Sequence, residues 1–510
     1  MKNMKIKAKL ITLFVLIKVI PLLMISYIAV MGAKSLSGYF SISTQTSFDE
    51  SNYIISTTAN TVIDDSIEAL NKKSQTAIEK QSSDIANSVA TFLYERDSDL
   101  LFLSKIPMSQ DLLESFYQSK SKEILIHGKY YYNEEKSIWQ KEKEQTSSSR
   151  DKTNAILEDN KIEFNYVDPK NLSKTTIPIY KEVVYFDIKG QEKFKVSEIN
   201  DKKLDLSQKN NTYIKAESYF EDIKSLKEGE IYVSDVIGAY VGSKIIGTFT
   251  KEKTKKSSLA FRPELHGYAG KENPLGKRFE AIVRFITPVV SQGKKVGYIS
   301  LALDHRHIME YTDTVNPVKE HKQDIADASV GNYAFMWNFE GQNISHARDY
   351  FIVGYNENTG EKVPGWVSAD IQKQYQESKS KNLHEFLKTY PKFEEQSLNK
   401  KPNLKQLKQK GELGLDCRYL NFAPQCQGWM QVTENGGYGS FIIYWSNVWK
   451  LTTAATIPYY TGKYKNTKRG FGFVTIGANV DEFHSAANKT KMKIEEVLKK
   501  QTATMKDGIE

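Results

Sequence analysis

The chain has 510 residues, 71 Lys and Arg against 62 Asp and Glu, and a formal net charge of +9. With 40% hydrophobic and 12% aromatic residues, the composition is typical of folded domains of about 100–200 residues each. It excludes a disordered, collagen-like or disulfide-stapled chain. No stripe of Lys and Arg interleaved with aromatic residues occurs, so we expect no nucleic-acid partner.

The N-terminal segment has the pattern of a membrane anchor. Four lysines in residues 1–9 precede an apolar run over residues 10–33, in which Lys18 is the only charge. A helix of this length can cross a hydrocarbon layer about 30 Å thick. Because positive charge marks the cytoplasmic side, we predict a cytoplasmic N-terminus and a single pass through the inner (cytoplasmic) membrane. The chain from Lys34 onward is then extracytoplasmic. A cleaved signal peptide is the alternative.

A long stalk helix is predicted over residues 34–105. From about Phe48 the chain is poor in Pro and Gly, and apolar residues recur on one helical face. This face packs either against the protein's own next domain or against a second copy in a parallel homodimer. The residues of the face are Ile63, Ile67, Leu70, Ala77, Ile85, Val89 and Phe92.

Beyond residue 105 the pattern changes to that of antiparallel strands. A short helix over 106–116 and an exposed polar loop over 141–152 come first. Apolar residues then alternate with polar ones, and Gly supplies the positive φ of each hairpin turn. The predicted hairpins occupy residues 177–197, 284–304 and 333–347, and the predicted long strands occupy 440–460 and 469–480.

The order of hairpin, irregular insert and paired long strands occurs twice. This weak internal repeat predicts an α+β fold with two tandem antiparallel-sheet modules, over residues 106–312 and 313–483. Residues 484–510 are predicted to form a C-terminal connector helix that leads back toward the membrane.

These segments together resemble the double Cache family of extracytoplasmic sensor domains, in which two PAS-like modules are carried on one long helix. The resemblance lies in EVVYFDIKGQEKFKV, EGEIYVSDVIG, ITPVVSQGKKVGYISLALDHRHI, GNYAFMWNFEGQNISHARDYFIVGY, DCRYLNFAPQCQGWM, KLTTAATIPYYTG and GFVTIGANVDEF. It implies a small-molecule receptor of a membrane-bound bacterial signal transducer. It also implies a cytoplasmic output domain, a kinase, a chemotaxis domain or a phosphatase, in cis or on a partner protein.

The resemblance implies that the ligand binds the first, membrane-distal module. Tyr232, Asp235 and Arg284 lie there on strand-like segments that could face one cavity. The guanidinium of Arg284 suits a ligand carboxylate. Alternatively, Arg284 pairs with an internal acid such as Asp235.

An amino-acid ligand is not implied by this resemblance. Family members that bind amino acids usually carry an Asp on the last strand of the distal module. This chain has Ala302 at that position, and Gly477 at the corresponding position of the second module.

An enzymatic function is not expected. The chain has no HExxH, GxSxG or GxxxxGK[ST] motif, although a membrane-anchored extracytoplasmic hydrolase is kept as the alternative function. His305 and His307 could share one strand face and hold a metal, but no third ligand is identifiable. A position at the surface or at a helix start is the other interpretation, and we expect no metal and no cofactor.

Cys417 and Cys426 are the two cysteines of the chain. Outside the cytoplasm, thiols nine residues apart can close a short disulfide loop. Two buried free thiols are the alternative.

Overall fold

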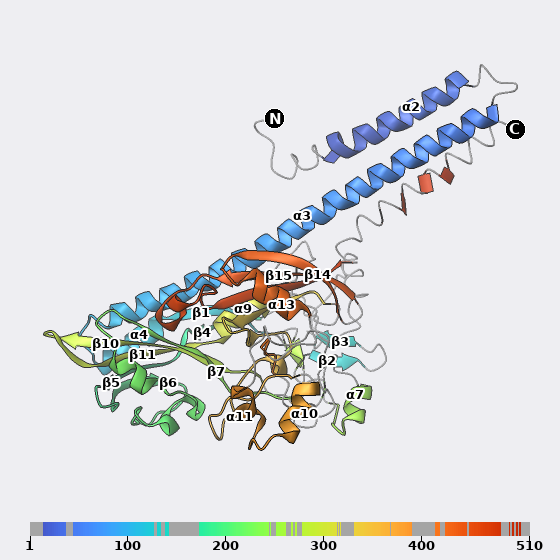
Figure 1. The fold of residues 1–510 in the computed structure, drawn as a ribbon. Helices are drawn as coiled ribbons and strands as arrows, with labels where there is room; N and C mark the ends of the chain where they lie inside the picture. Colours follow the sequence, from blue (N-terminus) through green and yellow to red (C-terminus); the bar gives the residue numbers. More distant parts are fainter. Residues whose placement is uncertain are drawn as a thin grey trace. The chain divides into compact units, whose positions relative to one another are not determined.

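A computed structural model describes residues 14–36, 44–126, 130–133, 138–141, 173–243, 245, 251–261, 267–268, 271–272, 278–313, 315, 317, 331–367, 369–389, 414–418, 424–445 and 448–480, with scattered positions between 489 and 500. The chain divides into two compact units (Figure 1). One unit is Met1–Ser74 with Phe483–Glu510, and the other is Gln75–Glu482.

The first unit begins with η1 (Val15–Val19), a short π-helical segment, followed by α2 (Ile20–Leu36). Among the described residues, no helix is both long and apolar enough to cross a membrane. The membrane-spanning helix predicted over 10–33 is therefore not confirmed. Its first four residues, and most of the C-terminal helix predicted over 484–510, lie outside the described part of the chain, while the described positions between 489 and 500 are helical.

The predicted stalk helix is confirmed as α3 (Thr44–Leu103). The absence of Gly and Pro over its 60 residues removes the strongest helix breakers. From Gln75 onward, α3 belongs to the second unit and buries one face there, which includes Val89, Phe92 and Leu93. This part of the helix thus packs against the protein's own modules, the first of the two alternatives.

The first module contains a five-stranded sheet in the order β6-β5-β11-β10-β7. Both hairpins predicted here are present, and Gln292 and Gly293 at the second turn have φ values of 49° and 74°. The strands are β5 (Tyr180–Asp187), β6 (Glu192–Ser197), β7 (Tyr232–Gly238), β10 (Ala281–Ser291) and β11 (Lys294–Asp304).

Smaller elements accompany this sheet. Ser109 caps α4 through its side chain, which accepts a hydrogen bond from the Leu112 amide at 3.2 Å. The predicted helix over 106–116 is therefore present, displaced by a few residues, while the loop predicted over 141–152 lies almost wholly outside the described residues. The elements are α4 (Gln110–Ser119), α6 (Tyr219–Lys224), α7 (Lys251–Lys256), α9 (Arg306–Asp313), η4 (Lys209–Asn211), η5 (Tyr213–Lys215), β1 (Ser121–Ile126), β2 (Tyr130–Asn133), β3 (Ile138–Lys141), β4 (Ser173–Pro178), β8 (Gly267–Tyr268) and β9 (Lys271–Glu272).

The second module repeats this architecture. Its five-stranded sheet has the order β13-β12-β16-β15-β14, with the same succession of hairpin and long strands. The α+β class and the pair of similar antiparallel sheets are thus confirmed, whereas the exact module boundaries at 312 and 483 stay predictions. The elements are β12 (Tyr333–Asn338), β13 (Asn343–Ser345), β14 (Tyr438–Trp445), β15 (Val448–Ile457), β16 (Gly472–Asn479), α10 (Ala369–Glu377), α11 (Leu383–Lys388), α13 (Pro424–Val432), η6 (Asp349–Phe351) and η8 (Gly462–Asn466).

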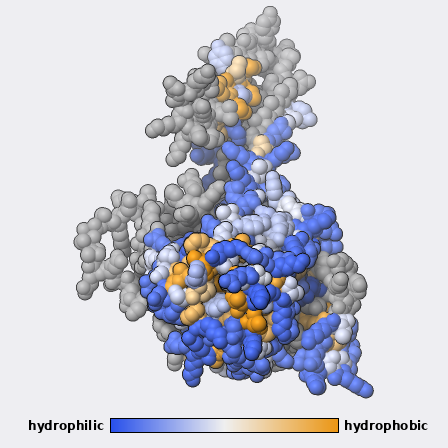
Figure 2. Space-filling model, turned by 90° about the vertical axis from the view of Figure 1, so that its left-hand side faces the viewer, coloured by the Kyte–Doolittle hydropathy of each residue, from blue (hydrophilic) through white to orange (hydrophobic). Residues whose placement is uncertain are grey.

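One apolar core joins α3 to both sheets. Leu93 of α3 is fully buried in a cluster that contains Phe285 of β10 and Val474 of β16. The surface of the second unit seen in Figure 2 is mainly hydrophilic, with hydrophobic residues gathered in a few small areas. Each sheet therefore turns one face toward α3 and the other face away from it.

Two buried aspartates on α3 accept hydrogen bonds from residues of the two modules. Asp97 accepts a hydrogen bond from the Tyr459 hydroxyl at 2.7 Å and another from Thr461, both after β15 of the second module. Asp99 accepts one from Tyr180 of the first module at 2.5 Å. A single turn of the helix is thus hydrogen-bonded to a strand of the first module and to a loop of the second.

Asp97 should make the stability of the protein depend on pH. Burial raises its pKa to about 6, although the hydrogen bonds from Thr461 and Tyr459 oppose the shift. Because the folded state then binds the proton more tightly than the unfolded state, this contribution is present at low pH and is lost as the pH rises through about 6. Between pH 7 and pH 5, the unfolding free energy of the wild type relative to Asp97→Asn should rise by about 1 kcal/mol.

Urea unfolding at several pH values, followed by circular dichroism, measures this difference. Asp205→Asn is the control, because hydrogen bonds from Ser207 lower the pKa of Asp205 and its titration falls below this pH range. A wild-type curve parallel to that of Asp97→Asn would contradict the prediction.

Candidate ligand-binding pocket

The face of the first sheet away from α3 carries polar side chains at its centre. Neighbouring residues of β10 alternate between the faces, so Val283 and Phe285 join the α3 core while Arg284 points to the other side. Arg284 pairs with Ala302 of β11, which pairs with Glu182 of β5. Residues directly opposite each other share a face, so these three positions form a row across the sheet.

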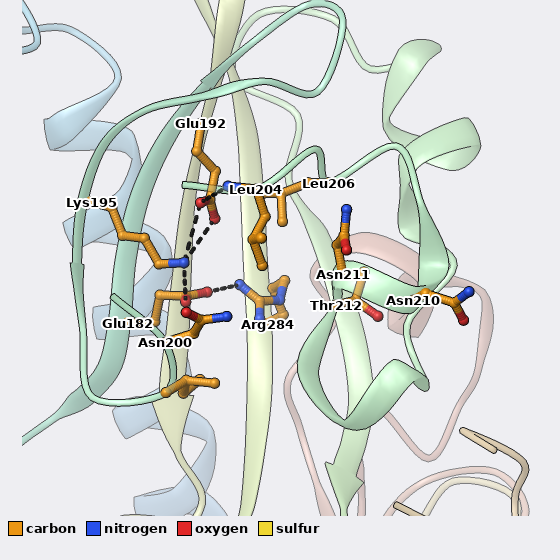
Figure 3. A pocket seen from close by; sticks show the side chains of 11 residues that line it. Glu182, Glu192, Lys195, Asn200, Leu204, Leu206, Asn210, Asn211, Thr212 and Arg284 are labelled. Carbon is orange, nitrogen blue, oxygen red and sulfur yellow. Dashed lines mark hydrogen bonds and ion pairs between the residues drawn. The ribbon is translucent and has the colours of Figure 1, made fainter. Parts of the chain in front are cut away.

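The connection between β6 and β7, residues 198–231, covers this face. Its apolar residues Leu206, Tyr219 and Phe220 pack against side chains of the sheet, among them Phe186 and Tyr298. Beside this apolar contact, the connection and the sheet enclose a pocket of about 250 Å³ (Figure 3). The pocket is lined by Glu182, Glu192, Lys195, Ile199, Asn200, Leu204, Leu206, Asn210, Asn211, Thr212 and Arg284.

The charged groups in and under the pocket pair with one another. The Arg284 Nε lies 2.6 Å from a Glu217 oxygen, and its Nη1 lies 2.9 Å from a Glu182 oxygen. Lys195 Nζ lies 3.2 Å from Glu192 and 3.6 Å from Glu182. Burial raises the pKa of Glu217 and of Glu192, and Arg284 and Lys195, respectively, oppose these shifts.

The pocket has two chemically different walls. In Figure 3, Glu182, Glu192 and Lys195 lie on one side of Arg284, while Asn211 and Thr212 of the covering connection lie on the other. One wall is therefore a compensated ionic network, and the other offers uncharged groups that form hydrogen bonds.

Of the three predicted ligand residues, Arg284 lines the pocket. The alternative that Arg284 pairs with an internal acid describes the structure, but the acids are Glu182 and Glu217 rather than Asp235. Tyr232 is half-buried on β7, where its ring centroid lies 6.1 Å from that of Tyr219. The three predicted residues thus do not meet in one cavity formed by described residues.

Asp235 is directed toward the second module. It forms an ion pair with Lys463 of η8. Burial would raise the pKa of Asp235, but the charges of Lys362 and Lys463 outweigh this effect and lower it. Asp235 is therefore placed as a contact between the modules rather than as part of the pocket.

The two neighbouring histidines have structural hydrogen bonds. His305 and His307 are fully buried at the start of α9, so the predicted helix-start position is right and a surface position is wrong. The Nε2 of His305 lies 2.7 Å from the Ile344 carbonyl oxygen, and that of His307 lies 2.9 Å from the Pro178 carbonyl oxygen. Within the described ranges, no three His, Cys, Asp or Glu side chains are grouped to hold a metal ion.

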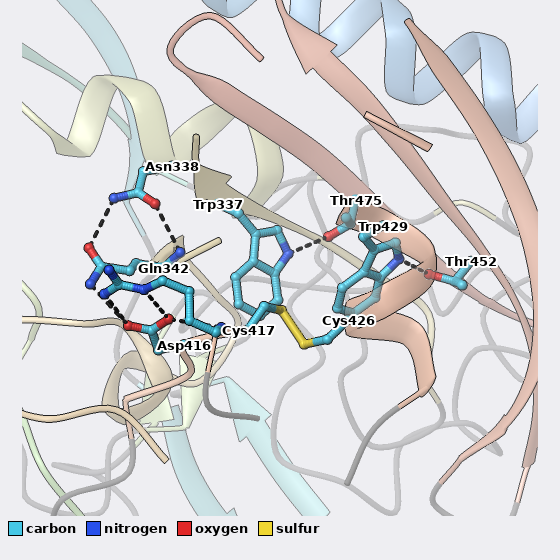
Figure 4. The surroundings of a disulfide bond; sticks show 10 residues. Trp337, Asn338, Gln342, Asp416, Cys417, Cys426, Trp429, Thr452 and Thr475 are labelled. Atoms are coloured by element: carbon cyan, nitrogen blue, oxygen red, sulfur yellow. Dashed lines mark hydrogen bonds and ion pairs between the residues drawn. A yellow bond between two sulfur atoms is a disulfide. The ribbon is translucent and has the colours of Figure 1, made fainter. Parts of the chain in front are cut away.

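In the second module, aromatic rings and a disulfide fill much of the corresponding sheet face (Figure 4). Cys417 and Cys426 are joined in a disulfide. The adjacent Trp337 donates its indole hydrogen to Thr475 at 3.2 Å, and Trp429 donates to Thr452 at 2.9 Å. The polar edges of the buried rings are therefore satisfied, and this region is a packed core.

The disulfide should stabilise the second module. Closing a loop between cysteines nine positions apart is worth about 2–3 kcal/mol in the chain-entropy description. The unfolding free energy of the Cys417→Ala/Cys426→Ala variant should fall by this amount, measured by urea unfolding. Mass spectrometry after alkylation without reductant should find neither cysteine labelled; full labelling of both would contradict the prediction.

No protein-family model matches the sequence, and no curated protein matches it either. Among solved structures, the chain is similar to a domain of a Vibrio parahaemolyticus protein of the sensory box/GGDEF family: they are 12% identical, 82% of this chain and 98% of that one are covered, and the TM-score is 0.35. It is also similar to the ligand-binding domain of the Pseudomonas fluorescens chemoreceptor CtaA in complex with L-isoleucine (8% identity, 82% and 98% covered, TM-score 0.34).

A third similar structure is the ligand-binding domain of the Pseudomonas aeruginosa amino acid chemoreceptor PctB in complex with L-Arg (8% identity, 80% and 96% covered, TM-score 0.31). Two of these three structures are thus ligand-binding domains of chemoreceptors. Because all three TM-scores lie below 0.5, we base the proposed function on the pocket and its residues.

Proposed function

We propose that the chain is the extracytoplasmic ligand-sensing region of a membrane-anchored signal receptor. A small polar molecule binds in the pocket of the first module, and a conformational change passes to a cytoplasmic output domain outside this sequence. The observation that carries this proposal is the pocket itself, which lies between a rigid sheet and a long irregular connection and has uncharged hydrogen-bonding groups on one wall.

The charges favour a neutral or positively charged ligand. Three carboxylates (Glu182, Glu192 and Glu217) face two cations (Lys195 and Arg284), and both cations already have ion-pair partners. An anionic ligand would have to displace a glutamate from Arg284 and leave that carboxylate buried without a partner, which is costly. We therefore replace the expected organic acid with a small neutral or ammonium-bearing molecule that can form hydrogen bonds to Asn210 and Asn211.

Signal transmission follows from the shared position of α3. A ligand that draws residues 198–231 closer to the sheet favours one packing of the first module over another. Since α3 packs against both modules and is hydrogen-bonded to both through Asp97 and Asp99, a shift of one sheet moves the helix relative to the other.

The remaining parts of this proposal come from the sequence. The apolar run over 10–33 with its preceding lysines supports a membrane anchor and an extracytoplasmic position for the modules. The apolar stripe predicted on the N-terminal part of α3 supports a homodimer contact. Labelling with a membrane-impermeant reagent in intact cells tests the orientation, and labelling only after lysis would contradict it.

A thermal-unfolding screen of the full chain in mild detergent tests the binding function. The probes are small amines, amides, sugars and, for comparison, organic acids. A ligand should raise the midpoint of the wild type, and Asn210→Leu should weaken its binding about tenfold, because a hydrogen bond to a polar ligand at the pocket wall is lost.

Asn358→Leu, an exposed asparagine outside the pocket, is the matched control and should bind like the wild type. A ligand that binds Asn210→Leu and Glu182→Gln with unchanged affinity would remove this pocket from consideration.

A further inference from the structure

The second module contains a buried lysine on the sheet face away from α3. Lys450 lies on β15, where it pairs with Asn479 of β16 and Ile443 of β14. Ala455 and Ile457 of the same strand belong to the core formed with α3, so Lys450, at the alternate positions, points to the opposite side. The residue is only 7% exposed.

Among the residues that the structure describes, Lys450 has no anionic partner, and its Nζ forms no hydrogen bond and no ion pair. The centroid of the Tyr333 ring lies 5.8 Å from Nζ. Burial lowers the pKa of Lys450 to about 8, and the positive charge of Arg348 lowers it further toward that value.

An ammonium group that is buried without an ion-pair partner lowers the stability of the folded state. Removal of such a group from water destabilises the folded state unless an anion or several hydrogen bonds replace the lost hydration. A nearby second cation makes the cost larger, because like charges repel. The local arrangement therefore has a positive potential that an anion would relieve.

In the first module, a cation at a similar place in the sheet has its charge neutralised by carboxylates of the protein. Arg284 also lies on the fourth strand of its sheet and on the face away from α3. There, Glu182 and Glu217 of the protein itself supply the negative charge. The two modules share their architecture but differ in this respect, since Lys450 has no internal carboxylate among the described residues.

The backbone beside Lys450 leaves room for its side chain. Gly331 has a φ of +86°, and a Cβ at this residue would lie 2.5 Å from the Lys450 Cε and 2.9 Å from its Nζ. Any larger residue here would displace the ammonium group. The lysine is therefore held in place by a glycine turn rather than by an ion pair.

We propose that Lys450 is the anchor of a second ligand site, in the second module, that binds a small carboxylate. A monovalent carboxylate matches the single unpaired ammonium, and the ring of Tyr333 and the side chain of Ile443 provide apolar contact for a short hydrocarbon part. A doubly charged phosphate would carry excess charge into this half-apolar setting. The site is independent of the pocket at Arg284, so one can exist without the other.

Acetate is the probe for this proposal. The full chain is titrated with sodium acetate at pH 7 against sodium chloride of equal ionic strength, and thermal unfolding is recorded. Acetate should raise the unfolding midpoint of the wild type in a saturable manner. Lys450→Met should weaken acetate binding tenfold or more, because it removes a charge-assisted hydrogen bond.

A second readout separates ligand binding from a structural role. Without acetate, Lys450→Met should unfold at the same temperature as the wild type or higher, since an apolar side chain of similar length replaces an unpaired buried charge. Lys465→Met removes an exposed lysine of η8 and serves as the matched control, which should respond to acetate like the wild type. Asn210→Leu should also keep the full acetate response, because it changes only the first pocket.

Three results would overturn the proposal: no response of the wild type to acetate beyond that to chloride, an equal response of Lys450→Met, or a lowered unfolding midpoint of Lys450→Met without acetate. Each of them leaves the pocket of the first module unaffected.

Discussion

Replacement of Arg284 by methionine should lower the free energy of unfolding by about 3–5 kcal/mol, because it leaves Glu217 buried without its cation and leaves Glu182 with only the more distant Lys195. Arg284 is 2% exposed, so water cannot replace the lost ion pairs. The triple variant Arg284→Met/Glu182→Gln/Glu217→Gln should recover most of the loss, since a neutral group costs far less to bury than an unpaired carboxylate. Urea unfolding followed by circular dichroism measures both variants.

The exposed ion pair between Lys224 and Glu221 provides the matched control for Arg284. Its atoms lie 2.6 Å apart, yet the two side chains are 49% and 78% exposed. Lys224→Met should therefore cost less than about 1 kcal/mol. A loss below 1 kcal/mol for Arg284→Met as well would show that the ionic network does not have the burial described above.

Truncation of Leu93 to alanine should destabilise both modules together, by about 2–5 kcal/mol. Leu93 of α3 is fully buried in the core that α3 shares with β10 and β16, and a deleted leucine side chain loses its transfer free energy and leaves a cavity. Because one core joins the two sheets, we expect a single unfolding transition that moves to lower urea concentration.

Phe102→Ala on the same helix is the control for Leu93. Its ring is larger, but it is 63% exposed, so its removal should change the unfolding free energy by less than about 0.5 kcal/mol. Two separate transitions, of which only one responds to Leu93→Ala, would contradict a common core.

The sequence predicts the secondary structure well where one local period dominates. The helix α3 follows from a long stretch free of Gly and Pro, and each hairpin follows from alternating residues around a glycine turn, as at Gln292 and Gly293. The repeat of this pattern also predicts two similar sheets. All these signals involve residues close together in the chain, which is why they can be read without the fold.

The membrane anchor predicted over residues 10–33 stays a prediction. The described part of this run contains the π-helical η1 and the beginning of α2.

The site could be predicted only in part, because its contacts are not local. Arg284 stands out as a charged residue within the apolar strand β10, and it does line the pocket. Its partners Glu217 and Glu182 are 67 and 102 positions away, so no spacing in the sequence connects them. One signal in the sequence does point to Glu182, because it is a charged residue between the apolar residues Tyr180 and Val184 of a predicted strand.

Asp235 also lies on a predicted strand-like segment, but it does not line the pocket. A shift of the strand register between Val283 and Phe285 interrupts the regular pairing of β7 with β10 at this point. Asp235 therefore reaches Lys463 of the second module. Strand alternation alone does not reveal such a bulge.

Hydrogen–deuterium exchange of the full chain, with and without a ligand found in the unfolding screen, tests the central proposal most directly. A ligand in the pocket of the first module should slow amide exchange in residues 198–213, which form the outer wall and have few strand hydrogen bonds of their own. Slowed exchange confined to the second module, with residues 198–213 unchanged, would contradict the proposal.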